Sequence, residues 1–271
     1  MTILQAIILG FVQGATEFIP VSSSGHLVLV PWLLGWPAPG LLFDTMVHWG
    51  TLVAIVAYFR RDWWVMIGAW VRGWAHRDWS DPNARLAWLL VIGSIPAAVL
   101  GLLLENWFES LFGEPGWVAF FLVVTAAILV VSEWLSRAGQ KRSLTDLRWT
   151  DALFIGVGQA VAIAPGISRS GATMSAGLVR GLDRPAAARF SFLLATPAIL
   201  GAGLLQMVKA ASTPDPTTQL GAVVVGFVVA LVSGYAAVWG LLRYLQRGKL
   251  TIFAAYCLWV GISCLIVAWL R

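Results

Sequence analysis

Charged residues are scarce in this sequence. Asp, Glu, Lys and Arg make up 11% of its 271 residues, whereas a globular protein of this size carries roughly 25%. Hydrophobic residues make up 59% of the chain, and its mean hydropathy is +0.81. This composition excludes a soluble domain and predicts an integral membrane protein embedded in a lipid bilayer. The formal net charge of +5 does not indicate a nucleic-acid partner, because the basic residues lie in short loops between apolar runs.

The sequence also lacks the residues of several common sites. Its two cysteines, Cys257 and Cys264, lie seven positions apart on one apolar run, so they cannot pair and we interpret them as small packing residues. There is no GxxxxGK(S/T) phosphate loop and no Cys/His cluster typical of zinc, and we expect no organic cofactor. No charged segment with a cleavage site precedes the first apolar run, so we expect no removable signal peptide.

Two stretches of the chain repeat each other. The segment QGATEFIPVSSSGH, which begins at Gln13, and the segment QAVAIAPGISRSGAT, which begins at Gln159, align at an offset of 146 positions. The alignment also matches Gly10 with Gly156. Each copy is a short apolar run that ends at a proline, followed by a Ser/Gly-rich turn and a second short apolar run. Paired interrupted segments in two halves of a membrane protein indicate a binding site near the bilayer midplane.

The apolar runs predict the fold class. Residues 3–12 and 27–36 are too short to cross about 30 Å of hydrocarbon, so we expect residues 2–35 to form a re-entrant helix pair, with its turn at Pro20 and the serines. A second broken pair is predicted at about 151–180. Full spans are predicted at about 41–60, 86–104, 117–136, 187–208, 219–243 and 251–270.

The sequence therefore predicts an all-α polytopic membrane protein with two inverted-topology repeats, each a re-entrant helix pair plus three transmembrane helices. Residues 1–271 form a single membrane domain in this prediction. Repeat one covers about 1–136, repeat two about 151–271, and a cytoplasmic linker 137–150 joins them.

The distribution of basic residues predicts the orientation. Fifteen of the 18 Lys and Arg residues fall on one face of this arrangement, and an acidic turn falls on the other. By the positive-inside rule the basic face is cytoplasmic. The basic residues lie in loop 60–85, in linker 137–150, after the second broken pair and before the last span; the acidic turn contains Glu105, Glu109 and Glu114.

The ionisable residues of the two turns are the candidate site. Gln13 and Glu17 are four positions apart and so share a helix face. His26 follows SSSG at the start of the returning helix, where backbone N–H groups favour an anion. Arg169 stands just after Pro165 and Gly166, and a guanidinium there suits a phosphate group. The hydroxyl groups and backbone of the neighbouring turn residues complete a predicted substrate-binding cradle: Gln13, Ser22, Ser24, Gly166, Ser168, Ser170 and Thr173.

Such a cradle could bind, transport or hydrolyse a phosphate compound. For hydrolysis, Glu17 or His26 could transfer the proton and Arg169 could stabilise charge on the phosphoryl oxygens. The candidate nucleophiles are Ser22, Ser23, Ser24 and His26, and among the serines we single out Ser23 as a catalytic residue. Glu17 could also hold Mg²⁺ or Ca²⁺, although Gln13 in place of a second carboxylate weakens that site. Asp44 and His48 are four positions apart and share a helix face. They either contact and support the site residues or form ordinary hydrogen bonds between helices.

The two turn segments resemble the signatures of the bacterial undecaprenyl-diphosphate phosphatase family, the bacitracin-resistance type. The matching stretches are EFIPVSSSGH after Gln13, PGISRSGAT after Ala164, and two lesser ones at 93–100 and 188–199, so the resemblance covers nearly the whole chain. It implies hydrolysis of a C55 isoprenoid diphosphate to the monophosphate carrier of cell-wall assembly. It also implies a bacterial plasma-membrane location with the site open to the periplasmic side.

The resemblance implies site roles for Ser23, His26, Ser168, Arg169 and Thr173, and places the Gln variant of an E/Q-xxx-E motif on Gln13 and Glu17. The other membrane lipid-phosphatase class, which also carries SGH, is excluded because it needs a later histidine and none follows His76. A lipid-phosphate transporter or flippase remains the alternative, since inverted repeats are typical of transporters. Whether the chain forms a homo-oligomer stays open.

Overall fold

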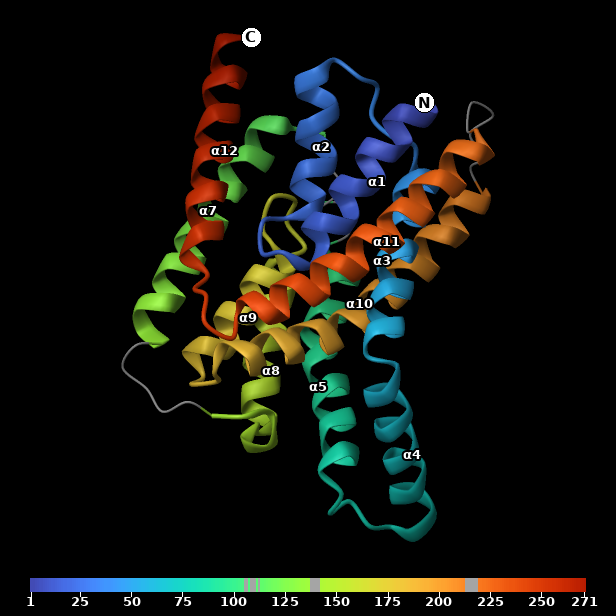
Figure 1. Cartoon of the computed structure of the whole chain (residues 1–271), viewed down its shortest axis with the longest axis vertical. Helices are drawn as coiled ribbons and strands as arrows, with labels where there is room; N and C mark the ends of the chain where they lie inside the picture. Colours follow the sequence, from blue (N-terminus) through green and yellow to red (C-terminus); the bar gives the residue numbers. More distant parts are fainter. Residues whose placement is uncertain (105–106, 108–110, 112, 137–141, 213–218) are drawn as a thin grey trace.

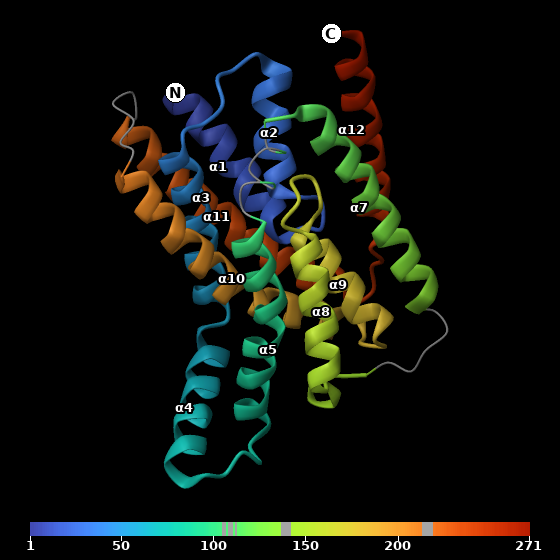
Figure 2. The same cartoon turned by 180° about the vertical axis from the view of Figure 1, so that it is seen from behind.

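Figures 1 and 2 show a computed structural model of the chain, which describes residues 1–104, 107, 111, 113–136, 142–212 and 219–271. Its described α-helices are α1 Ile3–Phe18, α2 Ser23–Leu34, α3 Leu41–Tyr58, α4 Arg60–His76, α5 Pro82–Leu103, α7 Pro115–Ser136, α8 Trp149–Val161, α9 Arg169–Val179, α10 Arg184–Ser212, α11 Leu220–Tyr244 and α12 Thr251–Leu270, with a short 3₁₀ turn η1 at Leu144–Asp146. Six of them, α3, α5, α7, α10, α11 and α12, are long and apolar enough to cross a membrane. The chain is thus an all-helical, multi-pass membrane protein, and the six predicted spans are confirmed.

One predicted loop is wrong. Residues 60–85 contain α4 and the first turn of α5, which begins at Pro82 rather than near residue 86. The segment carries too many arginines for a span, but its apolar residues recur at helical spacing, with Trp64 and Trp74 exposed. A helix of this composition is amphipathic and suits a membrane surface. In Figure 1, α4 and the start of α5 form a hairpin that extends away from the rest of the bundle.

The connections between helices divide between the two ends of the molecule. Both chain termini, the α2–α3 connection and the start of α7 lie at one end, which we call the terminal end (Figures 1 and 2). The α4–α5, α9–α10 and α11–α12 connections and the start of α8 lie towards the other, which we call the basic end because each of these segments carries an arginine: Arg77, Arg180, Arg247 and Arg148. Of the residues used for the orientation, Glu105, Glu109, Arg137 and Lys141 lie outside the described part of the chain.

Two helix pairs are broken in the middle of the molecule. Ile19, which precedes Pro20, caps α1 with extended backbone (φ −65°, ψ 134°), as expected of a residue before proline. The turn continues through Ser22, at a φ of 71°, to α2, and the α8–α9 turn passes through Gly166 at a φ of 99°. The two turns lie side by side at the centre of both views (Figures 1 and 2). A Cβ atom added to Gly25 would lie 3.2 Å from the Gly166 Cα, so the turns are in direct contact.

Glycines allow two close helix crossings. Gly10 of α1 lies against the backbone of Gly226 in α11, and Gly156 of α8 lies against the backbone of Gly93 in α5. Small residues at such contacts let membrane helices approach until their backbones touch. The two crossings hold the first helix of each broken pair and so position both turns.

We expect Gly10→Ala to lower the thermal unfolding midpoint of the purified protein in detergent. The new methyl carbon would lie 2.6 Å from the Gly226 carbonyl oxygen, and overpacking of this kind costs about 1–3 kcal/mol. Gly240→Ala is the matched control, because no atom within 4 Å would meet its methyl group and alanine favours a helix by about 0.5–1 kcal/mol. Equal midpoints for Gly10→Ala and the wild type would contradict the close crossing.

Candidate active site

Glu17 joins the two turns. It lies in the last turn of α1 with 6% of its surface exposed. Its Oε2 atom accepts hydrogen bonds from Gln13 Nε2, at 2.9 Å, and from the Ser23 hydroxyl. Its Oε1 atom is paired with the Arg169 guanidinium of the other turn. One buried carboxylate therefore contacts a hydroxyl group from its own turn and a cation from the opposite turn.

Arg169 is the first residue of α9, and its position follows from a helix cap. Ser168 is the N-cap residue, and its Oγ accepts a hydrogen bond from the Gly171 amide at 3.1 Å. While Arg169 Nη2 contacts Glu17, its Nη1 atom is buried without a hydrogen-bond partner, and so is Oε1 of Gln13. Buried polar atoms are nearly always satisfied, so these two atoms indicate a ligand. A phosphate oxygen is the natural acceptor for a guanidinium N–H.

The serines form the same arrangement in both turns. Ser22 Oγ accepts from the Gly25 amide at 3.2 Å and lies 3.3 Å from Ser24 Oγ. At the matching positions of the second turn, Ser168 Oγ lies 3.2 Å from Ser170 Oγ. The hydrogen bonds thus repeat at the sequence offset of the internal repeat. Because the two turns contact each other, the N-termini of α2 and α9 lie close together, and their amides and dipoles favour an anion there.

The two histidines near the turns have different surroundings. His26 is buried, and its Nδ1 lies 2.7 Å from the Ser22 carbonyl oxygen while its Nε2 lies 2.8 Å from the Tyr256 hydroxyl of α12. His48 of α3 has its Nε2 4.0 Å from Glu17 Oε2. Among the described histidines, it is therefore His48 that faces the Glu17 carboxylate. Of the pair Asp44 and His48, the structure brings His48 to the site.

Two predicted substrate-binding residues hold the second turn in place. The Gly166 carbonyl accepts a hydrogen bond from Thr125 Oγ1 of α7 at 2.9 Å. Thr173 directs its hydroxyl to the Arg169 carbonyl, at 2.8 Å, and to Ser191 of α10, at 2.6 Å. Both residues set the shape of the turn, and the Thr173 hydroxyl is already engaged by the protein.

Sequence reasoning missed two residues of the site. Thr125 also accepts a hydrogen bond from the Ser168 amide at 3.0 Å, so a single hydroxyl group holds both sides of the second turn. Tyr256 holds His26 from a helix 230 positions further along the chain. Thr125 gives no local signal, because it lies within an apolar span. Tyr256 carries the phenol hydroxyl typical of buried polar contacts, but nothing in the sequence indicates its partner.

The residues around Glu17 do not form a metal site by themselves. Both of its carboxylate oxygens already accept hydrogen bonds from Gln13, Ser23 or Arg169, and in the described part of the chain no three His, Cys, Asp or Glu side chains group as metal ligands would. A Mg²⁺ or Ca²⁺ ion at Glu17 stays a prediction, and the steps below use none.

The family described as "Bacitracin resistance protein BacA" matches residues 6–263. This chain belongs to that family. Relatives that carry the name undecaprenyl-diphosphatase match over the whole chain: those of Desulforudis audaxviator (strain MP104C) and Moorella thermoacetica are each 44% identical, with 100% of both chains covered. That of Methanobrevibacter smithii is 45% identical over 97% of this chain and 96% of its own.

The match to the BacA family includes every candidate site residue described above. It begins before Gln13 and ends beyond Tyr256. The resemblance expected from the two turn segments is thereby confirmed, and it extends to the helices α3, α7 and α12 that contribute His48, Thr125 and Tyr256.

Proposed function

We propose that this chain hydrolyses undecaprenyl diphosphate to undecaprenyl phosphate and inorganic phosphate, and so returns the lipid carrier to cell-wall synthesis. Its relatives are named undecaprenyl-diphosphatase. The observation that carries the proposal is the placing of Glu17 between the Ser23 hydroxyl and the Arg169 guanidinium. This set supplies a nucleophile, a base and a phosphate-binding cation in one buried place.

The terminal phosphate of the substrate binds where the two turns meet. The unpartnered Nη1 of Arg169 donates to one phosphate oxygen, and the amides at the starts of α2 and α9 face the others. Arg169 keeps Glu17 in place through Nη2 while Nη1 holds the phosphate. The other carboxylate oxygen of Glu17, Oε2, contacts the Ser23 hydroxyl and can accept its proton.

Hydrolysis proceeds in two steps. Ser23 Oγ attacks the terminal phosphorus while its proton passes to Glu17, and the bond between that phosphorus and the bridging oxygen breaks, so undecaprenyl phosphate leaves. Glu17 passes the proton from Ser23 to the departing bridging oxygen and becomes a carboxylate again. A water molecule then attacks the phosphoserine: its hydroxide joins the phosphorus, its other proton passes through Glu17 to Ser23 Oγ as the Oγ–P bond breaks, and inorganic phosphate leaves. Arg169 stabilises the charge that develops on the phosphoryl oxygens in both steps. His26 and His48 remain candidates for moving the protons to solvent.

Phosphate release by the purified protein in detergent tests this function. We expect undecaprenyl diphosphate to be converted stoichiometrically to the monophosphate and inorganic phosphate, because no transbilayer step is needed for hydrolysis. Glu17→Gln is the control, since it keeps the size of the side chain but cannot take the Ser23 proton. Tight binding of the lipid with no phosphate release would support a transporter or flippase instead.

The two halves of the chain act as inverted repeats in this proposal, each with a re-entrant pair that supplies one turn of the site. The repeated serine contacts support it, and so do the two glycine crossings of α1 with α11 and of α8 with α5. The protein lies in a bacterial plasma membrane with its basic end in the cytoplasm. The first turn then opens to the periplasmic side.

Cysteine labelling tests the orientation. In a variant without Cys257 and Cys264, we expect Ala38→Cys at the terminal end to react with an impermeant thiol reagent added to intact cells. Ser80→Cys at the basic end should react only after the membrane is permeabilised. Both residues are exposed and lie outside helices, so access to the reagent decides the result. Labelling of Ser80→Cys in intact cells would contradict the proposed orientation.

A further inference from the structure

The basic end carries an open pocket that the proposed reaction does not use. It has a volume of about 620 Å³ and lies between the N-terminal parts of α5 and α8. Its lining is Trp79, Arg85, Trp88, Leu89, Ile92, Arg148, Trp149 and Thr150. The volume falls within the range of about 300–1,000 Å³ typical of small-molecule sites, and the lining combines two arginines with three tryptophans.

The two arginines are held next to each other. The Arg85 guanidinium donates to the Leu147 carbonyl at 2.7 Å, one residue before Arg148. No side-chain partner in the described part of the chain engages the Arg148 guanidinium, which is exposed. Asp151 does not neutralise them, because its carboxylate is paired with Arg142, at 2.7 Å, and with Arg180, at 2.6 Å. The pocket therefore presents two cations without a carboxylate partner, and the positive end of the α8 dipole adds to their attraction for an anionic ligand.

The tryptophans place this charge at the level of lipid head groups. Trp149 is 61% exposed, and Trp79 is 37% exposed and packs edge-on against Trp88 with ring centroids 5.7 Å apart. Exposed indole rings favour the boundary between lipid head groups and hydrocarbon. Leu89 and Ile92 continue the pocket along α5 towards the apolar part of the span. The pocket is therefore cationic at one end and apolar at the other, which fits a molecule with an anionic head and an apolar tail.

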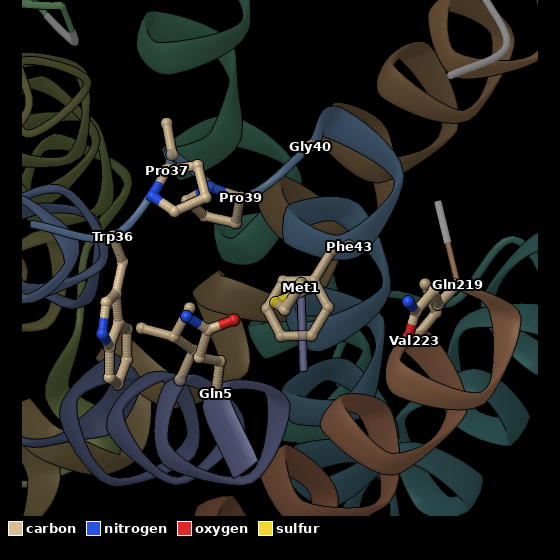
Figure 3. A pocket seen from close by; sticks show the side chains of 11 residues that line it. Met1, Gln5, Trp36, Pro37, Pro39, Gly40, Phe43, Gln219 and Val223 are labelled. Carbon is tan, nitrogen blue, oxygen red and sulfur yellow. The ribbon is translucent and has the colours of Figure 1, made fainter. Parts of the chain in front are cut away.

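The corresponding place in the other half lacks the charge. There, a pocket of about 120 Å³ lies beside the N-terminal parts of α1 and α11 (Figure 3). The labelled residues Gln5, Phe43 and Val223 come from three helices around it, α1, α3 and α11. None of the side chains that line this described pocket is charged. The architecture alone therefore does not require the arginines of the pocket at the basic end.

We infer that the pocket of Arg85, Arg148 and Trp149 binds the phosphodiester head group of an anionic phospholipid. The two guanidinium groups contact the phosphate oxygens, and the indole rings and Ile92 cover the upper acyl chains. Basic pockets between membrane helices are suited to such head groups. The site is separate from the residues proposed for hydrolysis, and its occupancy does not depend on that reaction.

The full-length protein, delipidated in a neutral detergent, is titrated with phosphatidylglycerol or phosphatidylcholine, and bound lipid is counted by native mass spectrometry. We expect the wild type to bind phosphatidylglycerol at least about tenfold more tightly than phosphatidylcholine. Arg85→Gln with Arg148→Gln should remove at least about tenfold of that affinity, because each arginine near an anionic lipid contributes about 1 kcal/mol. The matched control is Arg243→Gln with Arg247→Gln, two exposed arginines of the same end.

Arg148→Gln alone keeps the test valid if the double variant does not fold, since the Arg148 side chain is exposed and its guanidinium has no side-chain partner among the described residues. It should weaken phosphatidylglycerol binding about fivefold. Equal losses in the control pair would mean diffuse attraction and would overturn the site, as would a wild type without preference for phosphatidylglycerol. Displacement of the lipid by an equal concentration of inorganic phosphate would show a free-phosphate site and would equally contradict the inference.

Discussion

Ser23→Ala is expected to lower the single-turnover rate of undecaprenyl diphosphate hydrolysis by at least about 10³-fold, while binding of the lipid changes little. Ser23 donates its hydroxyl proton to the Glu17 carboxylate in a hydrogen bond, and we propose it as the nucleophile because Glu17 can act as its base. Loss of an attacking hydroxyl is among the largest single effects in hydrolases that use one. Binding and the rate at saturating enzyme would be measured on the same purified protein.

Ser24→Ala is the control for this prediction. Ser24 is the next residue, and its hydroxyl contacts only Ser22 among the described residues, so we expect a loss of no more than about tenfold. Rapid quenching should also trap phosphate on Ser23 as an acid-stable adduct. A Ser23→Ala variant within tenfold of the wild type, or an acid-labile adduct on His26, would show that Ser23 is not the nucleophile.

Arg169→Lys should lower kcat/KM by roughly 10²-fold or more. Lysine keeps the positive charge, but it has one nitrogen where Arg169 has two separate ones, of which Nη2 contacts Glu17 and Nη1 is unpartnered. A lysine cannot hold Glu17 and a phosphate oxygen at once in this planar geometry. Steady-state kinetics of the detergent-solubilised variant against the wild type would measure the loss.

Arg61→Lys, an exposed change outside the site, is the control for purification and folding. The thermal unfolding midpoint of Arg169→Lys should be compared as well, because Glu17 loses part of its buried ion pair. Near wild-type turnover in a folded Arg169→Lys variant would rule out the two-point contact.

Much of the site could be predicted from local sequence, because its main elements are helix ends. Pro20 excludes helix at Ile19, and Ser168 followed by Gly171 is a capping pattern, so both turns and the first position of α9 were predictable. The two turns and the helix cap depend only on neighbouring residues in the chain. The contact between the turns joins distant segments, and it could be inferred because the two segments match in the internal repeat.

The remaining contacts depend on distant helices, and no local pattern encodes them. His26 and Tyr256 are 230 positions apart, and Thr125 is 41 positions from Gly166. The helical character of 60–76 was missed for another reason: arginines exclude a span but do not exclude an amphipathic helix. The contact of His48 with Glu17 also depends on the packing of two helices. The sequence predicts which helix face carries His48, but not that this face contacts Glu17.

The pairing of Glu17 with Arg169 has a consequence for how the protein is made. The two residues are 152 positions apart, so at about 5–20 residues per second the ribosome adds Arg169 roughly eight to thirty seconds after Glu17. During that interval the first half of the chain holds a carboxylate whose final counter-ion does not yet exist. An unpaired charge in the hydrocarbon is costly. Until α9 has been made, the Glu17 carboxylate must therefore either stay in contact with water or be protonated. The ion pair that holds a charged Glu17 inside the protein therefore forms only late in synthesis.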